Sequence, residues 1–522
     1  IQTGVAISFM VKRMGHVKDT PRPARVHYLR RPELETAEEK LAFLASHPMR
    51  RLDFEEVQPD KTGNWVNLTD NDFETLLPLA SKETKAAKSS RDVKAIFHKF
   101  SLGVVTARDE WVYDFDSSEV ERKVRFLIDE YNSERLRLAG ILRNRKGLED
   151  RLEYRIKWSR AVKSDLSKSV EYNYAPELLS ASVYRPYVRQ KLYFSRQLNE
   201  MQYLLHGIFG PGQGSIALCI SGIPAAKPFQ VLAVDIIPCY DLLEKTQTLP
   251  LYRYEMGQRV ENITDWALNK FTTHYVAKTG KGKTARKITK EAIFHYCYAV
   301  LHDPIYREKY AQNLKREFPR IPLYGALLAD FWQWAGWGEA LMALHIGYET
   351  AAPFALARTD APDAKARAAG LPPKAMLRAD PAAGTIALDS ETTLHGIPPE
   401  AWTYKLGNRS ALDWVLDQYK ENKPKDPTIR EKFDSYRFAD YKEKVIDLLL
   451  TKCLKAQITY DGLQRKESFP VPPAALREAI LNAIVHKDYA SGIPIQISVY
   501  DNQLIIWNEG ELPEDWTVAK LK

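Results

Sequence analysis

Glu478 and Asn482 are the two residues whose types and spacing most directly suggest chemistry. They stand four positions apart in the run REAILNAIVHKDY (477–489), so on a helix both side chains lie on one face, one turn apart. A carboxylate at the first position can activate a water molecule, and an amide at the second can ligate magnesium. The pair therefore indicates a site where water is activated beside a bound magnesium ion.

A second group of residues is suited to holding a polyanion. Aromatic and basic side chains alternate in the β-rich stretch from Tyr184 to Arg196, and Lys227 lies in a loop between two predicted strands. Arginine forks can read guanine edges in the major groove of DNA, whereas lysine and tyrosine contact phosphates. The same aromatic residues could instead pack a core, and this alternative stays open. We predict DNA contacts at Arg185, Lys191, Arg196 and Lys227.

Other chemical signatures are incomplete or missing in the sequence. The basic loop 278–287 contains KGKT, but Gly280 is only two residues from Gly282, so the phosphate-loop spacing is not met. We interpret it as a flexible loop that could touch phosphates non-specifically. There is no His/Cys metal-ligand spacing. There is also no Asp/Asn-Pro-Pro-Tyr/Phe tetrapeptide, which would hold the amino group of a flipped base during methyl transfer.

The first third of the chain must supply an α/β framework and then a helical one. Short β-rich runs at 5–11 and 26–29 accompany a polar helix at 35–45, which is typical of the closing part of an α/β domain. Residues 118–170 are charged, favour helix and are rich in arginine and lysine. We predict a solvated helical face there, with a surface for the DNA backbone as the alternative.

From residue 171 the pattern changes to β character with many turns. Residues 216–220 and 231–237 have the apolar content of buried strands. Two helices are predicted next, at 289–301 and 304–317, the second with Asp303 as its cap before Pro304 at the first helical position.

Two later segments complete the predicted organisation. Residues 351–385 are rich in alanine, proline and lysine, so we predict an irregular connection. The tryptophans at 332, 334 and 337 form a stripe beside Leu341 and Leu344, which predicts a core face.

Composition is that of a soluble globular protein of several domains. The chain has 522 residues, is 45% hydrophobic and 27% charged, and its excess of 75 basic over 67 acidic residues gives only weak support for a polyanionic partner. The four cysteines form no C-x-x-C pair, which favours a reducing compartment. No apolar run approaches the roughly 18 residues that a membrane helix needs. We therefore predict a cytoplasmic protein with no membrane partner, and the strand-like start at Ile1 suggests a piece of something longer.

Several segments together resemble one protein family. They are IQTGVAI (1–7), SGIPAAKPF (221–229), IIPCYDLLEKTQ (236–247), ENITDWAL (261–268), YAVLHDP (298–304), KREFPRIP (315–322) and YKLGNRSALDW (404–414). They look like the C-terminal part of Type ISP restriction-modification enzymes, in which a nuclease and a helicase-like motor precede an adenine-specific DNA methyltransferase and a target recognition domain. The resemblance covers roughly residues 1–449.

This resemblance implies a domain organisation and its partners. Residues 1–115 would be the closing part of an α/β methyltransferase domain, and residues 116–449 a mixed α+β target recognition domain. The S-adenosylmethionine-binding motif and the catalytic tetrapeptide lie upstream in the family, so S-adenosylmethionine would serve only the parent protein. The implied partners are double-stranded DNA and the parent's nuclease, helicase and methyltransferase domains. Whether this chain is itself an enzyme stays uncertain.

From about residue 450 the resemblance changes. The runs at 454–465, 477–489 and 507–513 resemble the C-terminal ATP-binding module of RecG-like regulators, which are related to ATPases of the gyrase and histidine-kinase type. The resemblance implies a truncated Bergerat-type α/β sandwich over residues 450–522.

The same resemblance assigns roles to residues of this module. Glu478 would be the catalytic residue that polarises water, and Asn482 would bind the magnesium ion that accompanies ATP. Asn508 and Gly510 lie in the loop that would meet adenine. The leading hypothesis is therefore sequence-specific DNA recognition within a Type ISP-like adenine methyltransferase, and the alternative is an ATP-binding RecG-like regulator or helicase-related protein.

Overall fold

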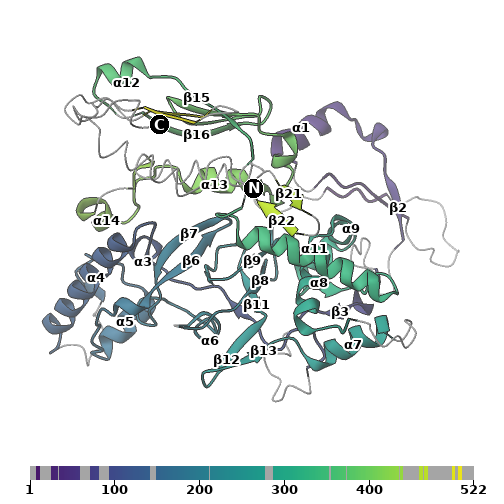
Figure 1. The fold of residues 1–522 in the computed structure, drawn as a ribbon, viewed down its shortest axis with the longest axis horizontal. Helices are drawn as coiled ribbons and strands as arrows, with labels where there is room; N and C mark the ends of the chain where they lie inside the picture. Colours follow the sequence, from purple (N-terminus) through teal and green to yellow (C-terminus); the bar gives the residue numbers. More distant parts are fainter. Residues whose placement is uncertain are drawn as a thin grey trace. The chain divides into compact units, whose positions relative to one another are not determined.

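The computed structural model describes most of the chain up to residue 438. It covers residues 7–11, 25–32, 35–58, 71–80, 93–140, 149–210, 212–276, 286–351, 354–371, 373–433 and 436–438, and the backbone of four strands between 458 and 507. The chain forms two compact units (Figure 1): unit 1 is Ile1–Ile346 with Pro398–Tyr436, and unit 2 is Gly347–Ile397 with Arg437–Lys522. Helices and sheets are mixed, in agreement with the predicted α/β and α+β character.

The first elements of unit 1 form a small β-α-β segment. β1 (Val26–Tyr28) pairs antiparallel with β2 (Glu55–Val57), and α1 (Ala37–Ser46) lies between them in the chain. Thr36 caps α1, because its hydroxyl accepts from the Glu39 N–H at 3.2 Å while the Glu39 carboxylate accepts from the Thr36 N–H at 2.7 Å.

Two of the three predictions for this region are confirmed. The strand predicted at 26–29 and the helix predicted at 35–45 correspond to β1 and α1. The strand predicted at 5–11 is wrong for its described part, since residues 7–11 are exposed and form no strand. Apolar alternation alone does not bury a strand, and no other described strand pairs with these residues.

A buried four-stranded sheet lies at the centre of unit 1. Its order is β4 (Ser101–Leu102), β11 (Gln247–Pro250), β8 (Ala217–Ile220) and β9 (Val231–Val234), all antiparallel. Every residue of β8, β9 and β11 is buried. The strand predicted at 216–220 is therefore confirmed, and the one predicted at 231–237 ends at Val234.

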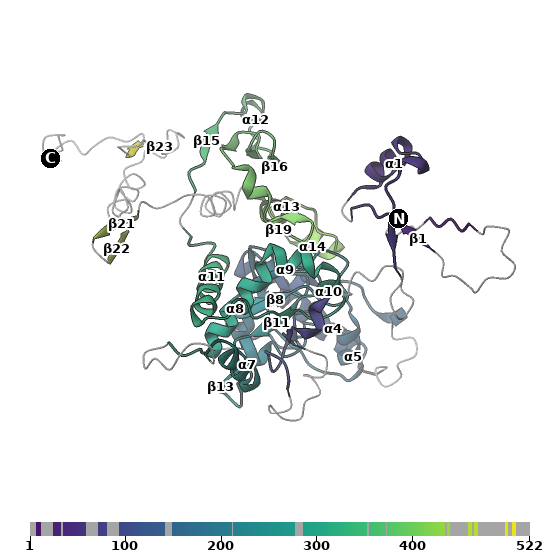
Figure 2. The same ribbon diagram turned by 90° about the vertical axis from the view of Figure 1, so that its right-hand side faces the viewer.

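Helices on one side of this sheet complete the main core. α7 (Asp265–Val276), α8 (Lys290–His302) and α11 (Leu328–Ile346) pack together, and α11 contacts β9 (Figure 2). Aromatic side chains fill the space between these helices; Tyr296 stacks on Phe331 with ring centroids 5.5 Å apart. Burial of such rings is the largest apolar contribution to this core.

The helices predicted after residue 288 are confirmed with one difference. α8 matches the helix predicted at 289–301, but the helix predicted at 304–317 is two helices, α9 (Pro304–Lys309) and α10 (Ala311–Arg316). Asp303 caps α9 as predicted, accepting from the Ile305 N–H at 3.0 Å. The break falls at Tyr310, whose hydroxyl donates to the carboxylate of Asp72 at 2.7 Å, a distant partner that no local pattern shows.

A second four-stranded sheet takes its strands from both sides of β8 and β9 in the chain. Its order is β10 (Ile237–Pro238), β6 (Leu179–Arg185), β7 (Val188–Tyr193) and β5 (Tyr113–Asp114), with β10 parallel to β6. The helices of this region are α3 (Asp109–Val112), α4 (Ser117–Arg137), α5 (Arg160–Ser167) and α6 (His206–Phe209). The predicted charged helical stretch 118–170 is thus two helices, α4 and α5.

Short elements complete unit 1. The strand pairs are β3 (Leu77–Pro78) with β14 (Arg320–Ile321), β12 (Tyr252–Glu255) with β13 (Gln258–Glu261), and β19 (Lys405–Leu406) with β20 (Arg409–Ser410). The remaining helices are α13 (Ala411–Gln418), α14 (Pro427–Lys432) and the short 3-10 turns η1 (Met49–Arg51), η2 (Asp72–Thr75), η4 (Glu149–Arg151), η5 (Pro176–Leu178) and η6 (Pro399–Trp402).

Unit 2 corrects the irregular connection predicted at 351–385. Its sheet has the order β15 (Ala357–Asp360), β18 (Thr392–His395), β17 (Thr385–Asp389) and β16 (Ala375–Asp380), with α12 (Ala364–Ala368) between β15 and β16 in the chain. Leu377, Ile386, Leu388 and Leu394 are buried at 2% exposure or less. These few apolar residues suffice for a sheet despite the alanine- and proline-rich composition.

The C-terminal segment of unit 2 is described only as two antiparallel strand pairs. They are β21 (Ile458–Asp461) with β22 (Gln464–Glu467), and β23 (Gln496–Val499) with β24 (Leu504–Trp507). Glu478, Asn482, Asn508 and Gly510 all lie outside the described residues. The Bergerat-type sandwich therefore stays a prediction.

The described residues also bear on the predictions about membrane, disulfides and metal. Among them, no helix is both long and apolar enough to cross a membrane. Cys219, Cys239 and Cys297 are buried and free. No group of three or more His, Cys, Asp or Glu side chains within the described part could hold a metal ion.

Candidate nucleic-acid interface

Loop 221–229 is fixed in place by the segment that precedes β11. The Glu244 carboxylate accepts from the N–H groups of Ala226 and Lys227 at 2.8 and 2.9 Å. The Lys245 Nζ donates to the Pro224 carbonyl at 3.1 Å, and the Gly222 N–H donates to the Glu244 carbonyl at 2.6 Å. These bonds hold the loop as one rigid piece at the end of β8.

A tight hairpin packs against the same loop. β19 and β20 are joined by Gly407 and Asn408, and Gly407 has φ +71°, a conformation that favours glycine. A Cβ at position 407 would lie 2.7 Å from the Gln230 Nε2, so a larger residue here would strain the backbone and displace the Gln230 side chain. The Ser410 hydroxyl caps α13 by accepting from the Asp413 N–H at 3.1 Å. Asn408 is therefore exposed at the tip of a well-supported turn.

Positive charge and one exposed amide gather where the loop and hairpin meet. We name Lys227, Lys245, Lys405, Asn408 and Arg409 the loop cluster. The first four are exposed, and Arg409 is partly exposed. Two of these cations lie over the Trp414 ring, with the Lys227 Nζ 5.9 Å and the Arg409 guanidinium 5.0 Å from its centroid. Only Arg409 has a carboxylate partner, Asp417 at 3.1 Å, among the ion pairs of this cluster in the described chain.

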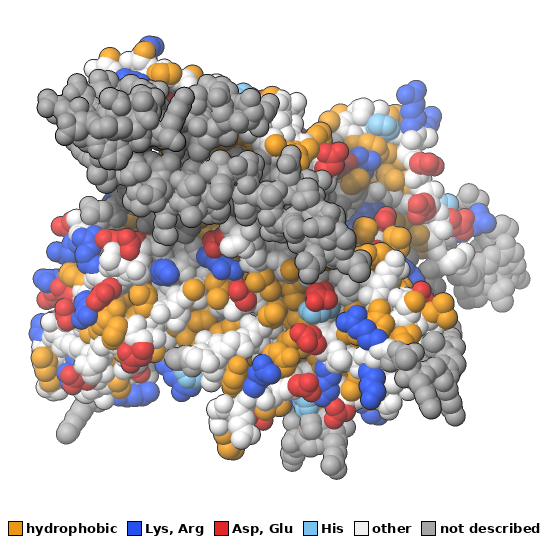
Figure 3. Space-filling view, viewed as in Figure 1, with side chains coloured by type: hydrophobic (Ala, Val, Ile, Leu, Met, Phe, Trp, Pro, Cys, Tyr) orange, Lys and Arg blue, Asp and Glu red, His pale blue; other side chains and the backbone are white. Residues whose placement is uncertain are grey.

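The loop cluster is a local feature of a surface of mixed charge. On the face drawn in Figure 3, lysine and arginine side chains are interspersed with aspartate and glutamate over the described atoms. The described atoms of this face therefore carry no broad field of one sign. Rigid loops that present an amide and flexible cations can contact both base edges and phosphates.

Arg185, the first residue predicted to contact DNA, is partly buried at the end of β6. Its guanidinium lies 4.0 Å from the Tyr184 ring centroid, and its Nη1 donates to the Tyr184 carbonyl at 2.8 Å and to the Cys239 Sγ at 3.4 Å. Burial opposes its charge, but Tyr184, Cys239, Asp109 and Asp241 together outweigh burial and raise the pKa of Arg185. The side chain is folded back on the protein beside the segment that also holds loop 221–229.

The other three predicted residues are exposed but do not form one patch. Lys227 belongs to the loop cluster, which follows β8 at Ile220. Arg196 lines a pocket that includes Pro250, and Pro250 pairs with Ala217 at the opposite end of β8. Lys191 lies on β7, opposite Asp114 and Ala181 in the second sheet.

Four members of the loop cluster, Lys245, Lys405, Asn408 and Arg409, were not among the residues predicted from the sequence. Lys245 and the hairpin lie in two of the family-like runs, 236–247 and 404–414, but neither run has the alternation of aromatic and basic residues used to choose the sites. The signal that could have identified the hairpin is the Gly407-Asn408 pair between basic residues, since a glycine in a two-residue turn exposes its neighbour.

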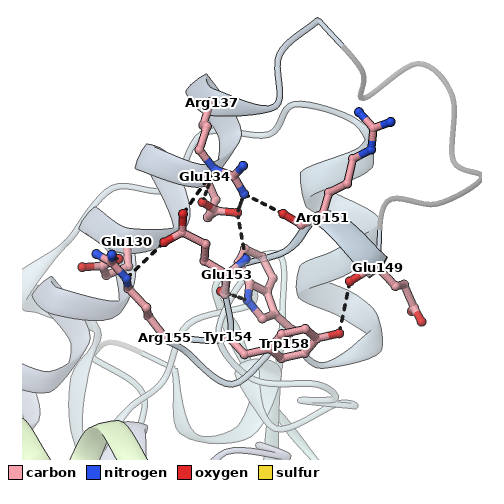
Figure 4. Close-up of polar contacts among 9 residues, drawn as sticks. All are labelled: Glu130, Glu134, Arg137, Glu149, Arg151, Glu153, Tyr154, Arg155 and Trp158. Carbon is pink, nitrogen blue, oxygen red and sulfur yellow. Dashed lines mark hydrogen bonds and ion pairs between the residues drawn. The ribbon is translucent and has the colours of Figure 1, made fainter.

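Most described arginines of the charged helical stretch are paired within the protein, and Arg151 is the exception, with no ion pair among the described residues. Figure 4 shows Arg137 facing Glu134, with Nε and Nη2 each 2.6 Å from a carboxylate oxygen, while Arg155 reaches Glu130 at 3.6 Å. Burial works against the charge of Glu134, but the bonds from Arg137 and from the Glu153 N–H prevail and lower its pKa. Because most basic side chains in the described part of this stretch have acidic partners, the geometry favours the solvated helical face over the alternative DNA-backbone surface.

A group of buried and partly buried tyrosines and histidines contacts the start of hairpin 405–410. The Tyr187 hydroxyl donates to the Tyr404 hydroxyl at 3.1 Å, just before β19. The Tyr298 hydroxyl accepts from the Ala233 N–H at 3.0 Å and lies 2.5 Å from the His345 Nδ1. Next to it, burial and then the charge of Arg307 lower the pKa of His302 well below its usual value.

Stability is expected to fall as the pH drops below about 6.5, the usual histidine pKa. Burial also lowers the pKa values of His98 and His295. Because the folded state resists protonating His302 and these two residues while the unfolded state does not, acid favours unfolding. The contribution of these histidines to the free energy of unfolding is fully present above the histidine pKa of the unfolded chain. It is lost as the pH falls from there towards the lower pKa values of the folded state. Urea unfolding between pH 7.5 and 5 measures this.

His302→Gln is expected to make the free energy of unfolding depend less steeply on pH. His27→Gln, at an exposed histidine on β1, is the control and is expected to leave the dependence unchanged. A slope that is the same in all three proteins would contradict the assignment to His302.

With the geometry described, comparison with known proteins gives the class. A family model described as the Type ISP C-terminal specificity domain matches residues 95–448. The chain therefore belongs to the Type ISP C-terminal specificity domain family. A search of curated proteins returned no match.

Solved structures of larger chains resemble this one. The chain in "cryoEM structure DrdV-DNA complex" is 48% identical with a TM-score of 0.69, and the match covers 82% of this chain and 42% of that one. A nuclease-deletion mutant of the Type ISP restriction-modification enzyme LlaGI, in complex with a DNA substrate mimic, is 26% identical with a TM-score of 0.62, covering 82% and 32%.

A third structure shares the fold at lower identity. It is the ATP-dependent Type ISP restriction-modification enzyme LlaBIII bound to DNA, which is 22% identical with a TM-score of 0.61, covering 76% of this chain and 25% of that chain. This chain spans less than half the length of each of these three chains.

Proposed function

We propose that this chain recognises the DNA target of a Type ISP-like restriction-modification enzyme that methylates adenine. The observation that carries the proposal is the family match over residues 95–448, combined with 48% identity to a chain solved with DNA. In this proposal the loop cluster contacts the duplex. Lys227, Lys245 and Lys405 neutralise phosphates, and Asn408 reads a base edge.

The supports of the exposed side chains fit these two roles, phosphate contact by the lysines and base reading by Asn408. Flexible lysines on a rigid loop contact phosphates without demanding one geometry. Asn408 projects from a hairpin that Gly407 and the α13 cap hold firmly, and an asparagine amide can make two hydrogen bonds to adenine in the major groove. Arg185, Lys191 and Arg196 stay predicted DNA contacts, each at a separate place on unit 1.

The proposal is tested by selecting duplexes with a randomised central stretch on the full chain across a salt series. Enrichment of one short sequence that persists in higher salt would support it. Equal binding to every duplex, with affinity falling steeply as salt rises, would show phosphate contacts alone and would overturn sequence recognition.

Asn408→Ala is expected to relax specificity at one position of the selected site. If Asn408 reads one base, its loss costs about 1–3 kcal/mol of discrimination at that position, and the other positions keep their preference. Competition binding with single-base variants of the selected duplex measures this. Asn422→Ala, at an exposed asparagine between α13 and α14, is the control. An equal loss on every sequence would refute base reading.

The proposal also includes the cofactors and the cellular location. S-adenosylmethionine would serve the methyltransferase part of the whole enzyme. ATP and magnesium at Glu478, Asn482, Asn508 and Gly510 remain predictions from the sequence resemblance, as does the alternative of an ATP-dependent regulator. Titration of the chain with a fluorescent ATP analogue, with Glu478→Ala and Asn482→Ala for comparison, tests them. Free buried cysteines agree with a cytoplasmic location.

A further inference from the structure

A pocket of about 240 Å³ opens beside the central sheet, away from the loop cluster. It lies where β12, α6 and the residues preceding β4 meet, and Lys99, Arg196, Tyr203, Leu204, Arg253 and Glu255 are among its lining residues. We propose that this pocket binds a single unstacked nucleotide, with the base on its apolar wall and the phosphate at Arg196 and Lys99. In the cell that nucleotide would come from the DNA of the proposed function, on which this inference rests.

The pocket holds more positive charge than its own carboxylate can neutralise. The Lys99 Nζ lies 3.0 Å from the Glu255 carboxylate, and Arg253 pairs with the same oxygen. Arg196 is exposed and makes no ion pair among the described residues. Three cations therefore face one carboxylate, so an anion is the ligand that this rim fits.

Arg253 gives a second, independent sign of a missing acceptor. Its side chain is only 12% exposed, and its Nε is buried with no hydrogen-bond partner. A buried donor without a partner is unfavourable, and an acceptor placed beside it would relieve that cost. Burial, and then the nearby charge of Arg253, lower the pKa of Lys99. This direction agrees with two cations that lie close together at the pocket.

The remaining wall suits a planar, apolar group. Phe100, Leu204, Ile208 and Pro250 line it, and most of its surface is apolar. Tyr203 is 41% exposed and has φ +50°, a conformation that tyrosine seldom adopts. The Ser101 hydroxyl fixes the turn by accepting from the Leu204 N–H at 3.1 Å. A strained, exposed aromatic residue beside a pocket is typical of a binding site.

Together these features select a nucleotide rather than a bare phosphate. A base is stabilised by stacking on an aromatic side chain, and its phosphate matches the surplus charge. The volume lies below the usual 300–1,000 Å³ of small-molecule sites, which restricts the occupant to one nucleotide. A paired base cannot enter such a pocket, so the DNA nucleotide must be unpaired or extruded.

Calorimetric titration of the full chain with thymidine 5′-monophosphate in EDTA tests the proposal. Thymine and the absence of magnesium keep the predicted ATP module from contributing. Saturable binding is expected, at least tenfold weaker in Arg196→Ala and Tyr203→Ala and unchanged in Lys270→Ala, whose exposed charge on α7 lies outside the pocket. Thymidine and inorganic phosphate are each expected to bind at least tenfold more weakly than the nucleotide.

A duplex with one unpaired thymidine identifies the source of the nucleotide. The unmodified chain is expected to bind it at least fivefold more tightly than the perfect duplex, and Arg196→Ala to lose this preference. No binding of the nucleotide, binding unaffected by Arg196→Ala, phosphate binding as tight as nucleotide binding, or no preference for the unpaired duplex would each overturn the proposal. Sequence enrichment without nucleotide binding would overturn the pocket alone, and nucleotide binding without enrichment would overturn only the proposed DNA recognition.

Discussion

Gly338→Ala is expected to lower the free energy of unfolding by about 3 kcal/mol, the upper part of the usual range for overpacking a core. Gly338 lies on α11 where this helix crosses α8. A Cβ there would stand 1.8 Å from the His295 carbonyl oxygen and 3.2 Å from the Ala299 nitrogen. Both are backbone atoms of α8, so no side-chain rotation can relieve the overlap, and the two helices must move apart.

Urea unfolding followed by tryptophan fluorescence measures this loss. Gly336→Ala is the matched control, because Gly336 is exposed on the same helix and its added Cβ would meet nothing within 4 Å. That variant is expected to be more stable than the unmodified chain by about 0.5–1 kcal/mol, the helix preference of alanine over glycine. A Gly338→Ala protein as stable as the control would contradict the close helix crossing.

Sequence patterns predicted elements wherever the signal is local. The apolar run at 216–220 and the Asp303-Pro304 cap belong to this class, because burial of a whole strand and capping of a helix leave marks on adjacent residues. The tryptophan stripe shows the limit. Trp332 and Trp334 pack against the core, but Trp337 is 53% exposed, since α11 turns only part of its apolar surface toward α8.

The candidate site was less predictable because distant segments create it. Loop 221–229 and hairpin 405–410 lie about 175 residues apart in the chain. They meet where Gly407 approaches Gln230, the residue that follows the loop. Neither segment alone shows which side chains it will expose. Arg185 shows the opposite case. Its place among aromatic residues suggested a guanidinium that reads a base, but the hydrogen bond to the Cys239 Sγ holds this guanidinium against the protein.

Glu244→Ala is expected to weaken binding to the selected duplex at least tenfold, although it removes a negative charge from the proposed DNA surface. Simple electrostatics predicts the opposite result, because a lost carboxylate raises affinity for phosphates. The Glu244 carboxylate, however, accepts the N–H groups of Ala226 and Lys227. Bonds to a charged group contribute about 1.5–3 kcal/mol, and about 1.4 kcal/mol corresponds to a tenfold change in affinity.

Asp241→Ala separates the two effects. Asp241 is an exposed carboxylate in the same segment, and no hydrogen bond from loop 221–229 to its side chain is found among the described residues. Its removal is expected to raise affinity for all duplexes slightly, whereas Glu244→Ala should weaken only the selected one and bring its affinity close to that of random DNA. Fluorescence anisotropy with both duplexes measures the difference. If the two variants behave alike, loop 221–229 does not need its anchor, and the loop cluster acts through charge alone.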